Sequence, residues 1–377
     1  MNDIKTKSTR EPLIHITKRD DVTFGQSVII HLIGIFIALI LSSLLIVAIT
    51  GLNPIQLFKS MIEGVVGTPA ANMGVNKKYM ESIHLVAILL CISLAVTPAF
   101  KMKFWNIGAE GQVLMGCLAS AYCMIEYGDT VEETPLILMM LGASILAGAI
   151  WAAIPAICKA FWNTNETLFT LMMNYIAMTL VSYFIMVKDK SGRSDLGIIN
   201  ERTEYGYLPN LFEMNYIFNI LIVVGITILM FIYLKYSKQG YEISVVGESE
   251  NTARYIGINV KSVIIRTVAI SGAICGIVGF MIVAGDKHSL KPSIVGGQGF
   301  TAIMVSWMSK FNPIIMVPVS ALIIFLSVGS KFATSNFNVD NSIGDILTAI
   351  VIFSIIACEF FTRYKINFRK SKRGDEV

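Results

Sequence analysis

Hydrogen-bonding side chains gather at the start of one apolar stretch, in the run Asn106-Ile107-Gly108-Ala109-Glu110-Gly111-Gln112. The residues that follow are mostly apolar, as in a helix that crosses a membrane. A carboxylate at membrane depth is costly and usually faces protein or water. Asn106, Glu110 and Gln112 are therefore candidates to line a path for a polar solute. Glu110 has an equal alternative role, because a helix N-terminus favours an acid and the side chain can tie helices together.

Asn174 and Tyr175 form a second polar pair, inside the apolar stretch Leu168–Val187. Their side chains suit hydrogen bonds to a polar solute, and they suit bonds between helices equally well. Uncharged hydrogen bonders fit hydroxyl-rich solutes better than ions. We therefore add both residues to the candidate substrate path.

A short capped helix is predicted in the polar segment 235–262. Ser249 can cap a helix that runs to about Ile256, and Gly257 can end it. Glu250 and Arg254 form an i,i+4 pair in the favourable order, while Ala253 and Ile256 supply an apolar face. Such a helix projects as a compact knob, which favours docking to a partner protein over a solvated loop. The candidate docking residues are Glu248, Glu250, Ala253, Arg254, Tyr255 and Gly257.

Enzymatic and metal chemistry have no support in the sequence. It contains no G-x-x-x-x-G-K-[ST] phosphate loop, so the chain cannot hydrolyse ATP by that route. It also lacks the HExxH and G-x-S-x-G motifs. The four histidines are dispersed and the six cysteines form no CxxC pair. We expect no catalytic residue, no metal and no cofactor.

The composition predicts an integral membrane protein. Only 15% of the 377 residues are charged and 54% are hydrophobic, with a mean hydropathy of +0.66, whereas soluble proteins carry about 25% charged residues. The apolar residues fall in blocks of roughly 17–25, the length of a helix that crosses about 30 Å of hydrocarbon. We predict an all-α, polytopic transmembrane helical bundle with about ten hydrophobic segments. These are Val28–Thr50, Ile83–Pro98, Ile107–Ile125, Pro135–Ile157, Leu168–Val187, Tyr216–Leu234, Val263–Ala284, Phe300–Met308, Pro313–Gly329 and Ile343–Phe361.

Two of these segments are short. Ile83–Pro98 ends in proline. Phe300–Met308 is too short to span a bilayer alone, and we interpret it as a half-helix that precedes a break at Asn312-Pro313.

The basic residues predict that both termini are cytoplasmic. If all ten segments cross, 19 of the 30 Lys and Arg residues fall on the side of the N-terminus and ten on the other side, and cytoplasmic loops are usually the more basic ones. The net charge of +4 therefore reflects membrane flanks and does not indicate a nucleic-acid partner. We divide the chain into a cytoplasmic tail 1–27, a transmembrane domain 28–361 with the cytoplasmic loop 235–262, and a cytoplasmic tail 362–377.

Two Gly- and Gln-rich junctions hint at an internal repeat. Ile83–Pro98 leads through an irregular basic stretch to Gly108–Gln112 and a new helix, and Val263–Ala284 leads in the same way to Gly296-Gly297-Gln298-Gly299. The predicted topology places the first junction at the cytoplasmic face and the second at the exterior, as in an inverted repeat. Chance similarity between two Gly-rich turns is an equal alternative.

The motifs resemble those of the ABC-transporter permeases that import branched-chain amino acids, ribose and nucleosides. Residues 106–112 resemble that family's Phe-Asn-Ile-Gly-Ala-Glu-Gly-Gln stretch, with Trp105 in place of the Phe. Residues 165–166 and 171–177 resemble its Asn-Glu and Leu-Asn-Tyr-Ile-Ala patterns. Residues 247–272 resemble its Gly-x-Asn-x-x-Ala-Ala-Arg-Tyr-x-Gly-Ile-Asn-Val-Lys loop and the following helix, with small departures at Ser249 and Thr252. The resemblance covers roughly residues 80–330 and is strongest to the nucleoside and simple-sugar branch.

The resemblance implies a permease subunit in a bacterial plasma membrane. It implies a second permease subunit, identical or different, ATPase subunits docked on the loop Glu248–Gly257, and an external substrate-binding lipoprotein that delivers the solute. The residues alone leave two other classes open. An ion-coupled secondary transporter would use Glu110 as its intramembrane acid, and a receptor or structural membrane module would also accommodate a capped inner helix.

Overall fold

The computed structural model describes residues 14–18, 24–67, 75–190, 192–209 and 216–368. Each of the ten predicted hydrophobic segments is helical. The helices are α1 Phe24–Thr50, α2 Pro54–Val66, α3 Val75–Lys101, α4 Ala109–Tyr127, α5 Glu133–Trp162, α6 Glu166–Lys188, α7 Ile217–Tyr236, α8 Lys238–Glu248, α9 Glu250–Tyr255, α10 Val260–Ile282, the π-helix η1 Val283–Lys287, α11 Gln298–Met308, α12 Pro313–Asn336 and α13 Asn341–Arg363. Two short strands, β1 Ile14–Lys18 and β2 Tyr364–Phe368, complete the described elements.

The number of full membrane crossings is smaller than ten by length and composition. Within the described residues, six helices are long and apolar enough to cross: α3, α5, α6, α7, α10 with η1, and α12. The pair α1 and α2, bent by 108°, adds a seventh if it counts as one span. α11 has 11 residues, about 16 Å of helix, or half of the hydrocarbon thickness. The predicted half-helix is thus present, and ten is only an approximate count of spans. The chain is an all-α, multi-pass membrane protein.

The chain divides into two compact units, residues 1–61 with 329–377 and residues 62–328. In the first unit α1 packs along α13, where Gly34 lies against the side chain of Cys358. β1 and β2 pair antiparallel, with Ile14 opposite Phe368. The sequence predicts only tails at 1–27 and 362–377. The paired strands β1 and β2 and the start of α1 at Phe24 are differences from that prediction. Residues 1–13, 19–23 and 369–377 of those tails lie outside the described residues.

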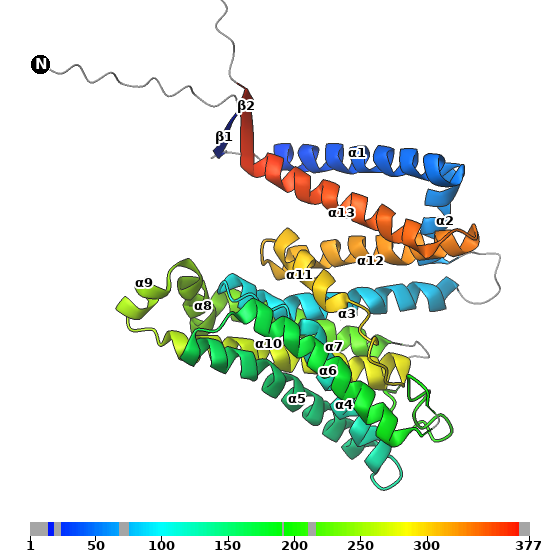
Figure 1. Ribbon diagram of the computed structural model, residues 1–377, viewed down its shortest axis with the longest axis vertical. Helices are drawn as coiled ribbons and strands as arrows, with labels where there is room; N and C mark the ends of the chain where they lie inside the picture. The colour runs from blue at the N-terminus through cyan, green and yellow to red at the C-terminus, as the bar shows by residue number, and fades with distance from the viewer. Residues whose placement is uncertain (1–13, 19–23, 68–74, 191, 210–215, 369–377) are drawn as a thin grey trace, which may run out of the picture. The chain divides into compact units, whose positions relative to one another are not determined.

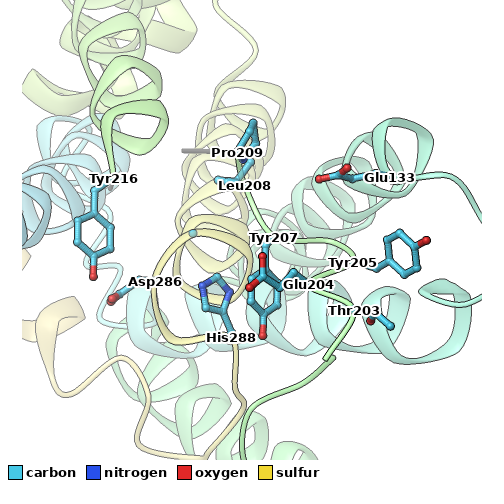
Figure 2. A pocket seen from close by; sticks show the side chains of 11 residues that line it. Glu133, Thr203, Glu204, Tyr205, Tyr207, Leu208, Pro209, Tyr216, Asp286 and His288 are labelled. Carbon is cyan, nitrogen blue, oxygen red and sulfur yellow. The ribbon is translucent and has the colours of Figure 1, made fainter. Parts of the chain in front are cut away.

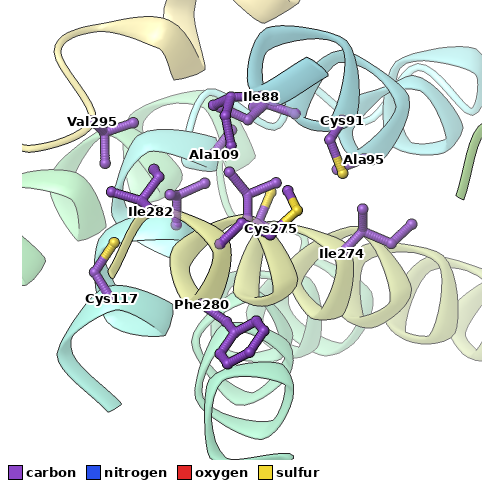
Figure 3. Close-up of a cluster of buried hydrophobic side chains, with 14 of the residues drawn as sticks. Ile88, Cys91, Ala95, Ala109, Cys117, Ile274, Cys275, Phe280, Ile282 and Val295 are labelled. Carbon is purple, nitrogen blue, oxygen red and sulfur yellow. The ribbon is translucent and has the colours of Figure 1, made fainter. Parts of the chain in front are cut away.

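The second unit is built around α10, which packs against α3, α4 and α5. Figure 3 shows Ile274, Cys275 and Phe280 of α10 among buried side chains of α3 and α4. Small residues allow the backbones to approach closely, as is common between membrane helices. Gly272 and Gly276 of α10 face the backbone of α5, and Gly279 faces the backbone of α4.

The two ends of this unit carry different elements. α8 and α9 pack on the ends of α3, α5 and α10 at one end, as Figure 1 shows. Gly247 of α8 lies against the carbonyl oxygen of Lys101, the last residue of α3. The candidate span Val260–Lys287 has 28 residues, about 42 Å of helix. η1 and the segment that follows it therefore lie at the opposite membrane face from α9.

A labelling experiment tests the predicted orientation. In a variant without native cysteines, a single cysteine at Glu133 should react with a membrane-impermeant reagent from outside intact cells. A cysteine at Tyr255, which is 92% exposed, should react only after the cells are opened. The opposite pattern would place α9 outside the cell and contradict the orientation that the basic residues predict.

Candidate functional site

Glu110 holds the start of α11. Its carboxylate accepts hydrogen bonds from the backbone N–H groups of Gly297 and Gly299, both at 2.8 Å. The side chain is 3% exposed. The first N–H groups of a helix lack partners within the helix and carry partial positive charge, which a carboxylate stabilises. Glu110 thus satisfies the α11 N-terminus, and the two Gly-rich junctions seen in the sequence meet at this point.

Glycine is required where α11 meets α4. Gly297 has φ 79°, in the left-handed region that favours glycine. A Cβ atom at Gly299 would lie 2.5 Å from the backbone nitrogen of Glu110 and 2.8 Å from its Oε2 atom. The chain before α11 forms turns instead of a helix, and such backbone is tolerated at membrane depth where protein or water surrounds it.

Asn106 and Gln112 form a buried pair of amides beside this junction. Gln112 Nε2 donates to Asn106 Oδ1 at 3.1 Å, and the backbone N–H of Gly108 donates to the same oxygen at 3.1 Å. Asn106 Nδ2 lies 3.4 Å from Ser271 Oγ of α10. Both amide side chains are at most 1% exposed. The pair therefore fixes the turn before α4 and links it to α10.

Asn174 fastens α6 to the same turn. Its Oδ1 accepts from the backbone N–H of Gly111 at 2.9 Å, and its Nδ2 donates to the carbonyl oxygen of Ile107 at 3.0 Å. Thr170, one turn earlier on α6, accepts from the backbone N–H of Ile107 at 3.2 Å. These bonds satisfy backbone groups that the break before α4 leaves free.

Tyr175 lies apart from this cluster, on the outer face of α6. It is 59% exposed. Thr179 and Ser182 are exposed on the same helix, four and seven residues further on, so the three hydroxyls share one face. Within the second unit nothing in the described chain covers this polar stripe, defined here as Tyr175, Thr179 and Ser182.

Four of the five predicted path residues thus come together, and Tyr175 does not join them. Their polar groups bond chiefly to protein, which matches the helix-tying alternative for Glu110. Whether they also act in transport remains a proposal. Thr170, Ser271, Gly297 and Gly299 belong to the cluster and were not predicted. The Gly-Gly-Gln-Gly run was the available signal for the last two.

Replacing Glu110 by glutamine should weaken the start of α11. The amide keeps one acceptor oxygen but turns an N–H₂ group toward a backbone N–H, and a buried donor without a partner costs about 1–3 kcal/mol. We expect a lower thermal stability of the purified protein and slower uptake, with normal membrane insertion. Glu132→Gln, an exposed acid, is the control.

Asn174→Ala removes the hydrogen bonds to Gly111 and Ile107. It should also lower the thermal stability and slow uptake. If both variants transport at the parental rate, the cluster serves packing alone, and the prediction that Asn106, Glu110, Gln112 and Asn174 line the substrate path is wrong.

α9 has the caps that the sequence predicts. Ser249 Oγ accepts from the backbone N–H of Thr252 at 3.2 Å. Gly257 has φ 88° and donates to the Arg254 carbonyl, and Ile258 donates to the Ala253 carbonyl at 2.9 Å. This pair of bonds closes a helix end on a left-handed glycine. Both ends of a six-residue helix are therefore fixed.

The surface of α9 is charged and aromatic, and a single residue anchors the helix. Ala253 is fully buried in an apolar cluster formed with α3, α5, α8 and α10. Ile256, expected on the same apolar face, is 51% exposed instead, because the helix ends at Tyr255 and the chain turns away. Arg254 pairs with Glu250 at 3.3 Å. Tyr255 points to solvent.

The sequence analysis does not predict α8 as a separate helix. α8 supports α9 and makes it rigid. Ser237 caps α8 through the backbone N–H of Gly240 at 2.9 Å. Glu242 of α8 forms an ion pair of 2.9 Å with Arg266 of α10. Glu248 ends α8 and is exposed. α9 is therefore fixed to α10 through α8.

Comparison with known proteins identifies the family to which this sequence is similar. Residues 79–356 match the family described as branched-chain amino acid transport system, permease component. The chain is 26% identical over 344 residues to the glucose ABC transporter permease protein TsgB13 of Haloferax volcanii, covering 88% of each chain. It is 27% identical over 297 residues to the guanosine ABC transporter permease protein NupP of Bacillus subtilis, covering 78% of this chain and 84% of that protein. It is 24% identical over 363 residues to the nucleoside ABC transporter permease protein NupB of Lactococcus lactis, covering 93% and 96%.

Proposed function

The chain belongs to the family of branched-chain amino acid transport system permease components, and from that premise we propose that it carries nucleosides or simple sugars, with nucleosides first. Permease components of ABC importers are not enzymes themselves, and they work with an ATPase and a substrate-binding protein. Relatives that cover most of this chain are permeases for guanosine, nucleosides and glucose. These solutes share several hydroxyl groups and carry no charge.

The polar stripe on α6 supports a hydroxyl-rich solute. α6 is long and apolar enough to cross a membrane. The hydroxyls of Thr179 and Ser182 donate to the carbonyl oxygens of Tyr175 and Met178 in the same helix, both at 2.9 Å, which leaves their oxygens able to accept a further hydrogen bond. Tyr175, Thr179 and Ser182 can exchange hydrogen bonds with a sugar hydroxyl without fixing an ion. One chain presents one wall, so we propose that a second permease subunit, identical or different, supplies the other wall. Asn106, Glu110, Gln112 and Asn174 hold the helices behind this wall.

The observation that carries the proposal furthest is the capped, rigid and exposed α9. This chain has no phosphate loop of its own, so energy for uphill transport must arrive through a contact. α9 with Glu248 offers a charged and aromatic surface fixed to α10, which suits docking of the ATPase subunit. We place α9 and both termini in the cytoplasm of a bacterial cell, with a substrate-binding lipoprotein on the opposite face.

Reconstitution tests this function. The chain would be purified with its co-expressed ATPase and partner permease and placed in liposomes that contain ATP. With the substrate-binding protein outside, we expect uptake of guanosine or uridine above that of glucose, and no uptake of leucine. ATP-independent uptake driven by a sodium or proton gradient would favour a secondary transporter. Leucine as the best substrate would contradict the proposed solute class.

A further inference from the structure

An apolar groove of about 520 Å³ lies on the surface formed by α4, α5 and α6. α4 packs against both of the other helices, and α5 and α6 are each long and apolar enough to cross a membrane. The groove therefore opens at membrane depth. No charged residue in the described part of the chain lines it. The lining includes Met115, Ala119 and Tyr122 of α4, Ala143 and Ala147 of α5, and Phe184 of α6.

The groove has about the length of one membrane leaflet. On α4 it runs from Met115 to Tyr127, which corresponds to about 18 Å of helix, and half of the hydrocarbon thickness is about 15 Å. α3 ends at Lys101 beside α8, and α4 begins soon after it. Tyr127, the last residue of α4, therefore lies toward the membrane face opposite α9 (Figure 1). The groove thus spans the hydrocarbon of the leaflet on that side.

A polar cavity of about 350 Å³ at the same face differs from this groove (Figure 2). It lies between the start of α5, the segment 203–209, the start of α7 and the end of η1. Its buried acid, Asp286, already has partners within the protein, because its Oδ2 lies 3.6 Å from His84 Nε2 and 3.2 Å from Lys287 Nζ. We therefore assign no ligand to this cavity.

An ion pair stands at the end of the groove nearest the membrane surface. Within the groove, the rings of Tyr122 and Phe184 meet edge to face, with their centroids 6.3 Å apart. Glu126 and Lys188 follow these residues by four positions in α4 and α6, about one helical turn further on, and their side chains form an ion pair. The two side chains are 35% and 32% exposed. A ligand with its tail in the groove would therefore place its polar end against one negative and one positive charge.

From this combination we infer that the groove binds an acyl chain of a phospholipid with a zwitterionic headgroup. The phosphate of such a lipid would bind Lys188 and its ammonium group would bind Glu126, each through a charge-assisted hydrogen bond. Van der Waals packing would hold the chain in the groove, as it holds helices together in a membrane. An anionic headgroup without the ammonium group has no partner for Glu126 and should bind more weakly.

The position of the groove on α6 favours a lipid over a second permease as its occupant. Phe184 follows Tyr175 by nine residues, and successive helical residues point about 100° apart. The two side chains therefore point to opposite sides of α6. The polar stripe begins at Tyr175, and it is there that we propose the second permease subunit. The groove faces away from that subunit.

Native mass spectrometry of the purified, delipidated full-length chain tests the acyl site. The probes are phosphatidylethanolamine and phosphatidylglycerol with the same acyl chains, offered in equal amounts. The groove variant is Ala143→Phe, and the matched control is Ala149→Phe, a partly exposed position of the same helix outside the groove. We expect the Ala143→Phe chain to retain one phospholipid fewer than the parent, and the Ala149→Phe chain to retain the same number. Equal retention in these two variants would overturn the inference.

The headgroup variant is Glu126→Gln with Lys188→Gln, and its control is Glu132→Gln with Lys190→Gln, which removes two exposed charges outside the groove. The headgroup variant should still bind a phospholipid, but its preference for phosphatidylethanolamine over phosphatidylglycerol should fall by roughly two- to tenfold. A preference that stays at the parental value, or that falls equally in the control, would contradict the proposed headgroup contacts. Loss of a copurifying permease from Ala143→Phe with unchanged lipid retention would make the groove a protein interface and would also overturn the inference.

Discussion

Replacing Arg254 by glutamate is expected to abolish ATP-driven uptake while the chain still inserts and keeps its permease partner. The exchange places like charges at positions 250 and 254 of α9. This costs an isolated helix only a few tenths of a kcal/mol, which is too little to unfold a membrane bundle. At a protein contact, a reversed and partly buried charge costs roughly 2–5 kcal/mol. The ATPase should therefore dissociate, and detergent copurification with uptake in proteoliposomes would detect both effects.

The double exchange Glu250→Lys with Arg254→Glu separates helix stability from contact. It restores opposite charges at positions 250 and 254, which form an ion pair in the native helix, although in the less favourable order. If Arg254→Glu acts by melting the helix, the double exchange should recover uptake. If it acts at the ATPase surface, uptake should remain lost. Normal ATPase retention and uptake in Arg254→Glu would remove the coupling role from α9.

The apolar helices and the caps of α9 were predictable because local physics sets them, whereas α2 and α8 were not predicted. Each of the ten predicted apolar segments is helical in the structure. The family resemblance of the motifs is confirmed by the match over residues 79–356. Ser249 and Gly257 mark the ends of α9 because a capping hydroxyl and a left-handed glycine act within a few residues. Their geometry needs no knowledge of the rest of the fold.

Contacts between distant segments were not predictable in the same way. The sequence places Glu110 at a helix start, but it does not show that its carboxylate serves α11, 187 residues further on. Tyr175 adjoins Asn174 in sequence, yet successive helical residues point about 100° apart. One side chain therefore faces the bundle and the other faces outward. Hydrophobic length likewise predicts a helix, but it does not show that the start of α11 is held by Glu110.

Replacing Gly276 by alanine is expected to destabilise the second unit strongly, although it adds only one methyl group. A Cβ atom at this position would collide with the carbonyl oxygen of Ser144 and lie 3.0 Å from the Cα atom of Ile145, both in the backbone of α5. Backbone of a packed helix cannot move aside as a flexible side chain can, so α5 and α10 must separate. Overpacking of this kind costs about 1–3 kcal/mol.

Alanine at Gly142 or Gly225 provides the control for this effect. A Cβ atom at either helical position meets nothing within 4 Å, and alanine favours a helix over glycine by roughly 0.5–1 kcal/mol. These variants should keep or raise the unfolding temperature in detergent, whereas Gly276→Ala should lower it and reduce the yield of folded protein. Larger residues at Gly276 should act more strongly, because each added atom widens the gap between α5 and α10. An unfolding temperature of Gly276→Ala equal to that of Gly142→Ala would mean that α5 and α10 do not meet through their backbones.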